Sequence, residues 1–143
     1  MALLAPDVNV LVDAFRADSP HHARVAPWWR GVVASEQSVV LFEPVLAGFL
    51  RVVTHPRVFD PPAPLDRALA FVDALESQPN VLRLPPGERH WEIFRALAAA
   101  AEARGNLVAD AWLAALALER GCTWITSDRD FARFPGLDWR PPG

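Results

Sequence analysis

Acidic residues follow the apolar segments of this sequence at positions from which their carboxylates could act together. Asp7 ends the apolar run "LLAPD", and Asp128 and Asp130 follow the run "CTWITS". Asp110 lies near the start of the apolar segment "NLVADAWLAALALERG", and Glu43 directly follows "SVVLF". Burying or crowding carboxylates is unfavourable unless another group compensates their charge. The pattern therefore indicates a site that holds a counter-charge.

A divalent cation is the counter-charge that this composition favours. Two carboxylates about 5 Å apart repel by roughly 3 kcal/mol at an effective dielectric constant near 20. The chain has no lysine to relieve that repulsion, because all 14 basic residues are arginine. Hard oxygen ligands select Mg²⁺, or Mn²⁺ as its substitute. Softer metals are not indicated, since no metal-ligand spacing connects Cys122 with the four histidines, His21, His22, His55 and His90.

Most of these acids also have a purely structural interpretation. Asp7 could cap the helix that follows it, and Asp128 could cap a short helix over 129–134. Asp130 and Glu43 could be first-turn acids that the helix dipole stabilises. Asp110 fits such an interpretation least well, because capping residues do not usually lie inside an apolar helix. The five acids together indicate a metal site more specifically than any one of them does alone.

The elements that must position these acids are predicted from apolar runs and turn signals. Strands are expected at 2–5, 38–42, 80–84 and 122–126, with a short edge strand at 137–139. Helices are expected at 8–16, 21–35, 44–53, 64–77, 87–105 and 106–121, and the proline-rich segment 55–64 is expected to be a loop. Ser19 and Pro20 mark the start of the second helix, Pro44 lies in the first turn of the third, and Gly105 closes the helix over 87–105. The segment 106–121 is apolar nearly all round, which predicts a buried helix.

Apolar strands that alternate with helices predict a parallel sheet covered on both faces. The expected fold is a three-layer α/β/α sandwich with a central, mostly parallel sheet of four to five strands, forming one domain over residues 1–143. Ligands of such sheets bind at the carboxyl ends of the strands, where the strand order reverses. Asp7 and Asp128 lie at those ends.

The composition of the chain excludes several classes of protein. No apolar run reaches the roughly 18 to 20 residues that a membrane helix needs, and no basic segment precedes the first apolar run, so no secretory signal is expected. The single cysteine, Cys122, excludes an internal disulfide, suits a reducing cytoplasm and is interpreted as a small core residue. The absence of lysine excludes a P-loop and Schiff-base chemistry. The net charge of −3 argues against a strongly basic nucleic-acid surface, but not against an enzyme that meets nucleic acid through a bound metal.

The sequence resembles the PIN-domain ribonucleases, and specifically the VapC-type toxins of bacterial toxin–antitoxin pairs, over almost its whole length. In "LAPDVNVLVDAF", Asp7 and Asn9 match the first acid of the family and the polar residue that follows it. The segment "FLRVVTHPRVF" also matches, and Asp110 in "LVADAWLAALALERG" matches the third acid. In "WITSDRDFARFPGLDW", Asp128 matches the fourth acid and Asp130 the frequent fifth.

The sequence departs from this family at one position. The family's usual second acid is a glutamate just before the residues that match "FLR", where this chain has Gly48. The nearest acid is Glu43, five residues earlier. Either Glu43 supplies that carboxylate from the start of the helix, or the position is vacant.

The resemblance implies Mg²⁺-dependent endonucleolytic cleavage of RNA, with Mn²⁺ as a substitute ion. Asp7, Asp110 and Asp128 would be the catalytic metal ligands, and Asp130, with Glu43 if it reaches, would hold metal-bound water or a second ion. Hydrogen-bonding support would come from Asn9 and Ser127, whereas Thr126 is equally well explained as a strand residue. Arg51 would contact a phosphate, or would be an ordinary surface arginine.

The resemblance also implies partners. Such toxins pair with a small antitoxin and usually form homodimers, so a homodimer is expected, with a heterotetramer or larger assembly when the antitoxin is bound and with no membrane association. The aromatic segments "PWWRG" and "HWEIF" are where partner or dimer contacts are expected, although core packing explains most aromatic residues equally well.

Three other classes of protein fit this sequence less well. A phosphatase of the haloacid-dehalogenase type needs a second aspartate two residues after the first, where this chain has Asn9, and it also needs a lysine. A receiver domain is excluded by the same missing lysine. A catalytically degenerate PIN fold, acting only as an RNA-binding or protein-interaction module, is favoured by Gly48 alone.

Overall fold

Five short apolar segments form one sheet in which every strand pair is parallel. The computed structural model describes residues 3–143, so the predicted strand residue Ala2 lies outside the described residues. The strand order is β3-β2-β1-β4-β5, which confirms the predicted parallel sheet. The strands are β1 (Leu3–Pro6), β2 (Val39–Leu41), β3 (Val81–Arg83), β4 (Cys122–Ile125) and β5 (Trp139–Arg140).

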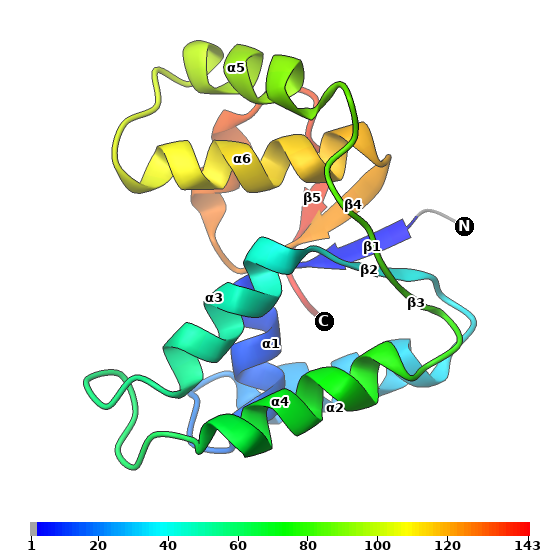
Figure 1. Ribbon diagram of the computed structural model, residues 1–143, viewed down its shortest axis with the longest axis vertical. Coiled ribbons are helices and arrows are strands. Elements are labelled where there is room, and N and C mark those ends of the chain that lie inside the picture. The colour runs from blue at the N-terminus through cyan, green and yellow to red at the C-terminus, as the bar shows by residue number, and fades with distance from the viewer. Residues whose placement is uncertain (1–2) are drawn as a thin grey trace.

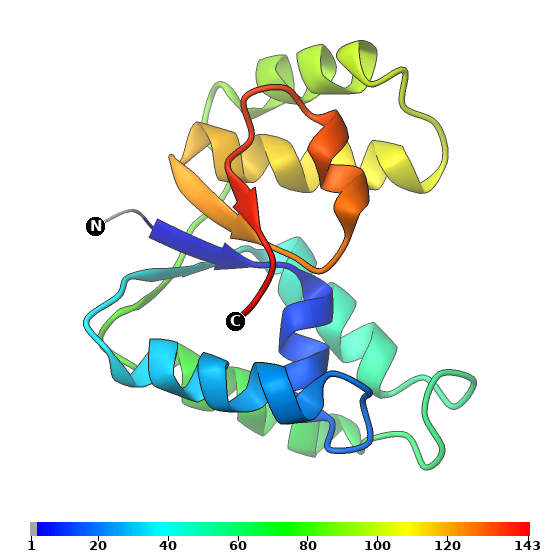
Figure 2. The same ribbon diagram turned by 180° about the vertical axis from the view of Figure 1, so that it is seen from behind.

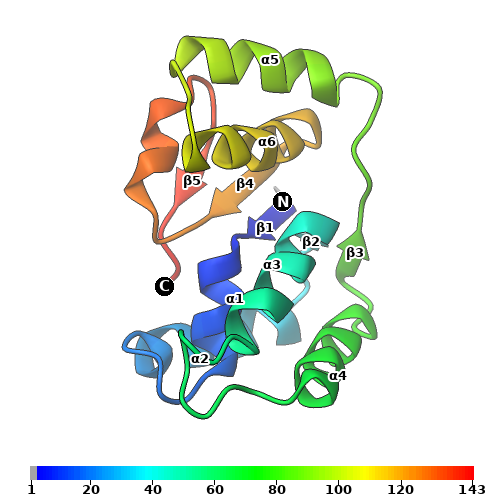
Figure 3. The same cartoon turned by 60° about the vertical axis from the view of Figure 1, so that its left-hand side comes forward.

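Helices cover both faces of this sheet. One layer contains α1 (Val8–Phe15), α2 (His22–Ala34), α3 (Glu43–Val53) and α4 (Leu65–Glu76), and the opposite layer contains α5 (His90–Ala100) and α6 (Asn106–Glu119) (Figures 1 and 3). The chain moves outward from β1 to β2 to β3 and then crosses back to β4. Because parallel crossovers are right-handed, this reversal transfers the later helices to the other face. The predicted three-layer α/β/α architecture is confirmed.

The strand order reverses between β1 and β4, at the centre of the sheet (Figure 2). The register pairs Pro6 with Ile125, so the residues that follow the two strands are neighbours. The Asp7 amide donates to the Ile125 carbonyl over 2.8 Å, and the Thr126 amide donates to the Arg140 carbonyl over 2.9 Å. These hydrogen bonds extend the ladder one residue beyond each strand and fix where the two side chains emerge.

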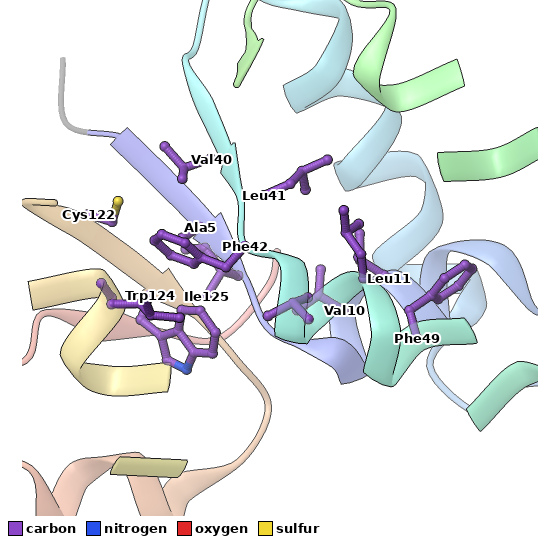
Figure 4. Packing of buried hydrophobic residues seen from close by; sticks show 14 of the residues in the cluster. Ala5, Val10, Leu11, Val40, Leu41, Phe42, Phe49, Cys122, Trp124 and Ile125 are labelled. Atoms are coloured by element: carbon purple, nitrogen blue, oxygen red, sulfur yellow. The ribbon is translucent and has the colours of Figure 1, made fainter. Parts of the chain in front are cut away.

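The core lies between the sheet and its helices. Figure 4 shows side chains from several elements gathered in it, among them Ala5, Val10, Val40, Phe49 and Trp124. Burying an apolar side chain of this size fully contributes about 1.5 to 3 kcal/mol, and the ends of β1 and β4 are thereby held in place. Cys122 is also buried, and burial raises the pKa of its thiol to about 11, which confirms its interpretation as a core residue.

The helix predicted over 87–105 is shorter than expected. It ends at Ala100, and Glu102 then adopts a left-handed conformation with φ of 49°. The Glu102 amide donates to the Ala99 carbonyl and the Ala103 amide to the Ala98 carbonyl, as in a Schellman motif. Gly105 was wrongly predicted to close this helix; it is the N-cap of α6, with φ of 61°. The sequence misled because glutamate occupies the position that glycine usually takes.

Two further predictions about helices need correction. The residue before α2 is His21, and Ser19 instead donates its hydroxyl hydrogen to the buried carboxylate of Asp13. In α6, burial begins at Ala111; Val108 in the first turn is exposed, and Asp110 directly after that turn is half-buried. This turn projects beyond the core toward the carboxyl ends of the strands, so its residues meet solvent despite their apolar character.

The remaining elements agree closely with expectation. The segment after β4 forms a short 3₁₀ helix, η1 (Arg129–Arg133), and β5 begins two residues later than the predicted edge strand. Within residues 3–143, no helix is long and apolar enough to cross a membrane.

Candidate active site

Asp7 lies at the carboxyl end of the central strand β1 and at the start of α1. Its Oδ1 accepts a hydrogen bond of 2.7 Å from the Val8 amide, so Asp7 is the N-cap of α1. The side chain is buried, and burial raises the pKa of Asp7. The charge of Asp128 raises this pKa further, whereas hydrogen bonds from Thr126, Val8 and Asn9 act in the opposite direction. The carboxylate is thus both a helix cap and a member of an acidic cluster.

Thr126 connects the ends of the two central strands. Its hydroxyl donates to Asp7 Oδ2 over 2.7 Å, and its Oγ1 accepts from the Asp128 amide over 3.0 Å and from Asn9 Nδ2 over 3.2 Å. The Thr126 side chain is 0% exposed. Because one hydroxyl orients groups at both strand ends, Thr126 belongs to the candidate site, whereas the sequence alone explained it equally well as an ordinary strand residue. The signal that could have identified it is a hydroxyl between the end of an apolar strand and an aspartate.

Asn9 supports the same arrangement from the first turn of α1. Its amide nitrogen donates to Asp7 Oδ2 over 3.1 Å, and its Oδ1 accepts from the Ser127 amide over 3.1 Å. Asn9 therefore fixes the loop after β4 against α1. Ser127 takes part through its backbone amide.

Asp128 and Asp130 lie on the turn that leads into η1. Asp128 Oδ1 accepts a hydrogen bond of 2.9 Å from the Asp130 amide and caps η1. Asp128 is half-buried and Asp130 is exposed. The 3₁₀ conformation keeps both acids at the edge of the sheet where β1 and β4 end.

Asp110 faces this group from the first turns of α6. Burial raises its pKa to about 6, and the charges of Asp128, Asp7 and Asp130 each contribute to the rise. Four aspartates from three separate parts of the chain therefore lie near enough to repel one another. Within the described residues, the ion pairs with arginine involve other acids: Asp18, Glu76, Glu92 and Asp138. The cluster has no such counter-charge.

The chemistry of these donors fits a hard divalent cation. Within residues 3–143, no three acidic, histidine or cysteine side chains are gathered closely enough to hold a metal ion between them. Of the neighbouring acids, Asp128 and Asp7 act most strongly on Asp110, and the exposed Asp130 acts least.

Glu43 and Gly48 lie on α3, which packs against α1. Glu43 is exposed in the first turn of α3 and lines a small cavity of about 90 Å³ with Leu84 and Trp112. Its charge is not among those that raise the pKa of Asp7 or Asp110. A Cβ atom at Gly48 would lie 2.8 Å from Val8 Cγ2, so Gly48 permits the close approach of α3 to the start of α1. Arg51 is exposed, one turn further along α3.

Solved structures share this fold. The likeness to VapBC2 from Rickettsia felis, solved with a DNA fragment from its promoter, has a TM-score of 0.71 at 15% identity and covers 97% of this chain and 98% of that one. VapC20 of Mycobacterium tuberculosis, a toxin that cleaves the sarcin–ricin loop, gives a TM-score of 0.66 at 15% identity and covers 90% and 92% of the two chains. At this level of identity the likeness shows the fold alone.

Several curated relatives are more similar to this chain in sequence than these solved structures are. A VapC ribonuclease of Mycobacterium bovis is 49% identical over 140 residues, which are 98% of this chain and 95% of the relative. Ribonuclease VapC25 of Mycobacterium tuberculosis is 43% identical over 137 residues, 95% and 96% of the two chains. The sequence profile of the PIN domain matches residues 4–137. The chain therefore belongs to the PIN-domain family and, within it, to the VapC ribonucleases, which are metal-dependent.

Proposed function

We propose that this protein is the toxin of a type II toxin–antitoxin pair and cleaves RNA endonucleolytically with a bound Mg²⁺ ion, for which Mn²⁺ can substitute. One nuclease domain over residues 1–143, acting in the cytoplasm, would carry this activity. The observation that supports it most directly is the meeting of Asp7 and Asp128 at the carboxyl ends of β1 and β4, where Thr126 bonds to both residues. Asp110 lies close enough that burial and the charges of Asp128, Asp7 and Asp130 raise its pKa to about 6. Uncompensated acids at the switch point of a parallel sheet are expected where a cation and its ligand bind.

Asp7, Asp110 and Asp128 would hold the ion, with Asp130 at the solvent edge. When bound, such an ion supplies activation of water for in-line attack on phosphorus and neutralises charge on the phosphate and on the leaving oxygen. The residues of the chain itself would orient the Asp7 carboxylate. Thr126 and Asn9 donate to Asp7 Oδ2, so the carboxylate keeps one position while its charge remains free for the cation.

The expected partner is a small antitoxin. VapBC2 from Rickettsia felis was solved bound to a DNA fragment from its promoter, and FitAB was solved bound to an IR36 DNA fragment. By analogy, this chain would form a homodimer and assemble with its antitoxin into a heterotetramer or a larger complex.

Cleavage and cation binding test the proposal together. We expect Asp7→Asn, Asp110→Asn and Asp128→Asn to abolish Mn²⁺- or Mg²⁺-dependent cleavage of RNA, mapped by sequencing the RNA ends. A cation at 100 times its Kd should stabilise the wild-type fold by about 2.7 kcal/mol, and Asp7→Asn should lose most of that gain. Asp73→Asn, at an exposed position of α4, is the matched control and should keep both properties. Glu43→Gln should lower cleavage at limiting Mg²⁺ if Glu43 supplies the second carboxylate, and should leave it unchanged if that position is vacant.

Equal stabilisation of the wild type and Asp7→Asn by the cation would contradict a shared site. A wild-type chain that binds RNA without cutting it in Mn²⁺ would favour the degenerate PIN fold instead.

A further inference from the structure

A groove lies between α3 and α6, directly beside the acidic cluster. It has a volume of about 430 Å³, and its lining includes Val8, which follows Asp7, and Ala109, which precedes Asp110. The first turn of α3 lies next to α6 in two different views (Figures 1 and 3). A molecule in this groove would therefore touch the residues adjacent to two of the proposed metal ligands.

Helical spacing explains why the groove is open. From α3 it is lined by Pro44, Ala47, Gly48 and Arg51, which recur every three or four residues and so share one face of the helix. Ala109 contributes a third small side chain from α6. Small residues on both walls leave the space that larger side chains would fill.

Trp112 forms a rigid aromatic wall of this groove. Its ring meets those of His90 and Phe94 edge to face, with centroid distances of 4.1 Å and 5.2 Å. His90 Nε2 also lies 3.0 Å from the Trp112 carbonyl oxygen, which joins α5 to α6. These contacts hold the ring in one orientation while the residue stays half-buried at the groove. A fixed, partly exposed indole is the kind of side chain on which nucleobases stack.

Among the described residues that line the groove, Arg51 is the one with a charge, and it is a cation. The acids lie beside the opposite wall, so the groove has a positive charge on α3 and an apolar floor leading to the cluster. An apolar peptide side chain would fit the walls but would leave the guanidinium without a counter-charge. A nucleotide satisfies both features, because it combines a flat apolar base with a phosphate.

We propose that this groove binds one unpaired nucleotide of the RNA substrate, with its base against Trp112 and a flanking phosphate at Arg51. The inference rests on the proposed ribonuclease function, since it assigns the nucleotide next to the cleaved bond. It also assigns a purpose to Gly48, where any larger side chain would enter the groove or displace Val8.

Binding of RNA without cleavage tests the subsite. The probe is a fluorescein-labelled, single-stranded RNA of eight nucleotides with random sequence, titrated in EDTA and followed by anisotropy. Trp112→Leu keeps apolar bulk but removes stacking and should raise the Kd about five-fold or more. Arg51→Gln should weaken binding and lower the slope of log Kd against log salt concentration by about 0.7. Trp139→Leu on β5 and Arg67→Gln on α4 are the matched controls and should bind as the wild type does.

A further variant distinguishes loss of the groove from loss of folding. Ala47 is exposed on the groove wall, so Ala47→Leu should fill the groove without touching the aromatic contacts of Trp112. It should weaken RNA binding while leaving the melting temperature within the range of the controls. The proposal is overturned if Trp112→Leu, Arg51→Gln and Ala47→Leu all bind RNA with wild-type affinity. It is overturned equally if these variants lose binding to the antitoxin but keep wild-type affinity for RNA.

Cleavage measured in parallel separates the two hypotheses. If the wild type cuts RNA in Mn²⁺ and the groove variants bind RNA normally, the subsite is wrong and the ribonuclease proposal stands. If the wild type does not cut RNA but the groove variants lose affinity, the subsite is supported and the catalytic proposal fails.

Discussion

Replacing Asp110 with asparagine should stabilise the metal-free protein at neutral pH and leave it unchanged in acid. Burial and three neighbouring carboxylates raise the pKa of Asp110 from 3.8 to about 6 in the folded state. Between these values the unfolded chain has released its proton while the folded chain still holds it. Folding stability therefore falls as pH rises from about 4 to about 6, and the full penalty remains above that range. Asparagine is a neutral isostere and carries no such penalty.

The size of the penalty follows from the shift. At 1.36 kcal/mol per pKa unit, a rise from 3.8 to about 6 corresponds to about 3 kcal/mol. Asp110 is only half-buried, and solvent screens its interactions, so a value of about 1 to 2 kcal/mol is expected at pH 7.5. The penalty should be close to zero at pH 3.5, where both states are protonated.

Urea unfolding in EDTA at several values between pH 3.5 and 8 measures this difference. Asp73→Asn, at an exposed position of α4, is the control and should track the wild type at every pH. The reasoning is refuted if Asp110→Asn is less stable than the wild type at pH 7.5. It is refuted equally if the difference between the two proteins does not change with pH.

Two further predictions concern single side chains near the site. Thr126→Val removes the hydroxyl that Asp7, Asn9 and the Asp128 amide share, so it should lower the free energy of unfolding in urea by about 1 to 3 kcal/mol. Thr126→Ser keeps a hydroxyl and should lose less than half as much. A Thr126→Val protein as stable as the wild type would contradict the shared hydrogen bonds. Gly48→Ala places a Cβ 2.8 Å from Val8 Cγ2, so overpacking of about 1 to 3 kcal/mol should outweigh the gain of about 1 kcal/mol in helix propensity. In a Val8→Ala background the same change should become stabilising, and a double-mutant cycle without coupling would exclude this contact.

The sequence predicted where the acids of the site meet better than it predicted the hydrogen bonds that orient them. Apolar strands alternating with helices require a parallel sheet, and the acids after the first and last of the long strands must then meet at one edge. Asp7, Asp110, Asp128 and Asp130 could be grouped from this argument together with the family resemblance. The hydrogen bonds of Thr126 could not, because a threonine in a β-branched run satisfies strand propensity equally well.

Local signals failed where tertiary contacts compete with them. Gly105 suits a helix end, but the Ala98–Ala103 and Ala99–Glu102 hydrogen bonds close α5 earlier. Asp110 was expected to be buried because its sequence neighbours are apolar, yet the first turn of α6 extends past the core. Whether Glu43 reaches the cluster also depends on the path of α3, which the contact between Gly48 and Val8 sets.

The structural and functional interpretations of Asp7 do not compete. As the cap of α1 it uses Oδ1 and the first helical amide, and its Oδ2 accepts from Thr126 and Asn9. All three donors are neutral, so they orient the carboxylate and lower the cost of burying it without cancelling its charge. An arginine in the same place would have stabilised the metal-free fold more strongly and would have competed with a cation. Among the described residues no arginine forms an ion pair with this cluster, so its charge stays available to a cation. Burial and the neighbouring carboxylates raise the pKa values of Asp7 and Asp110.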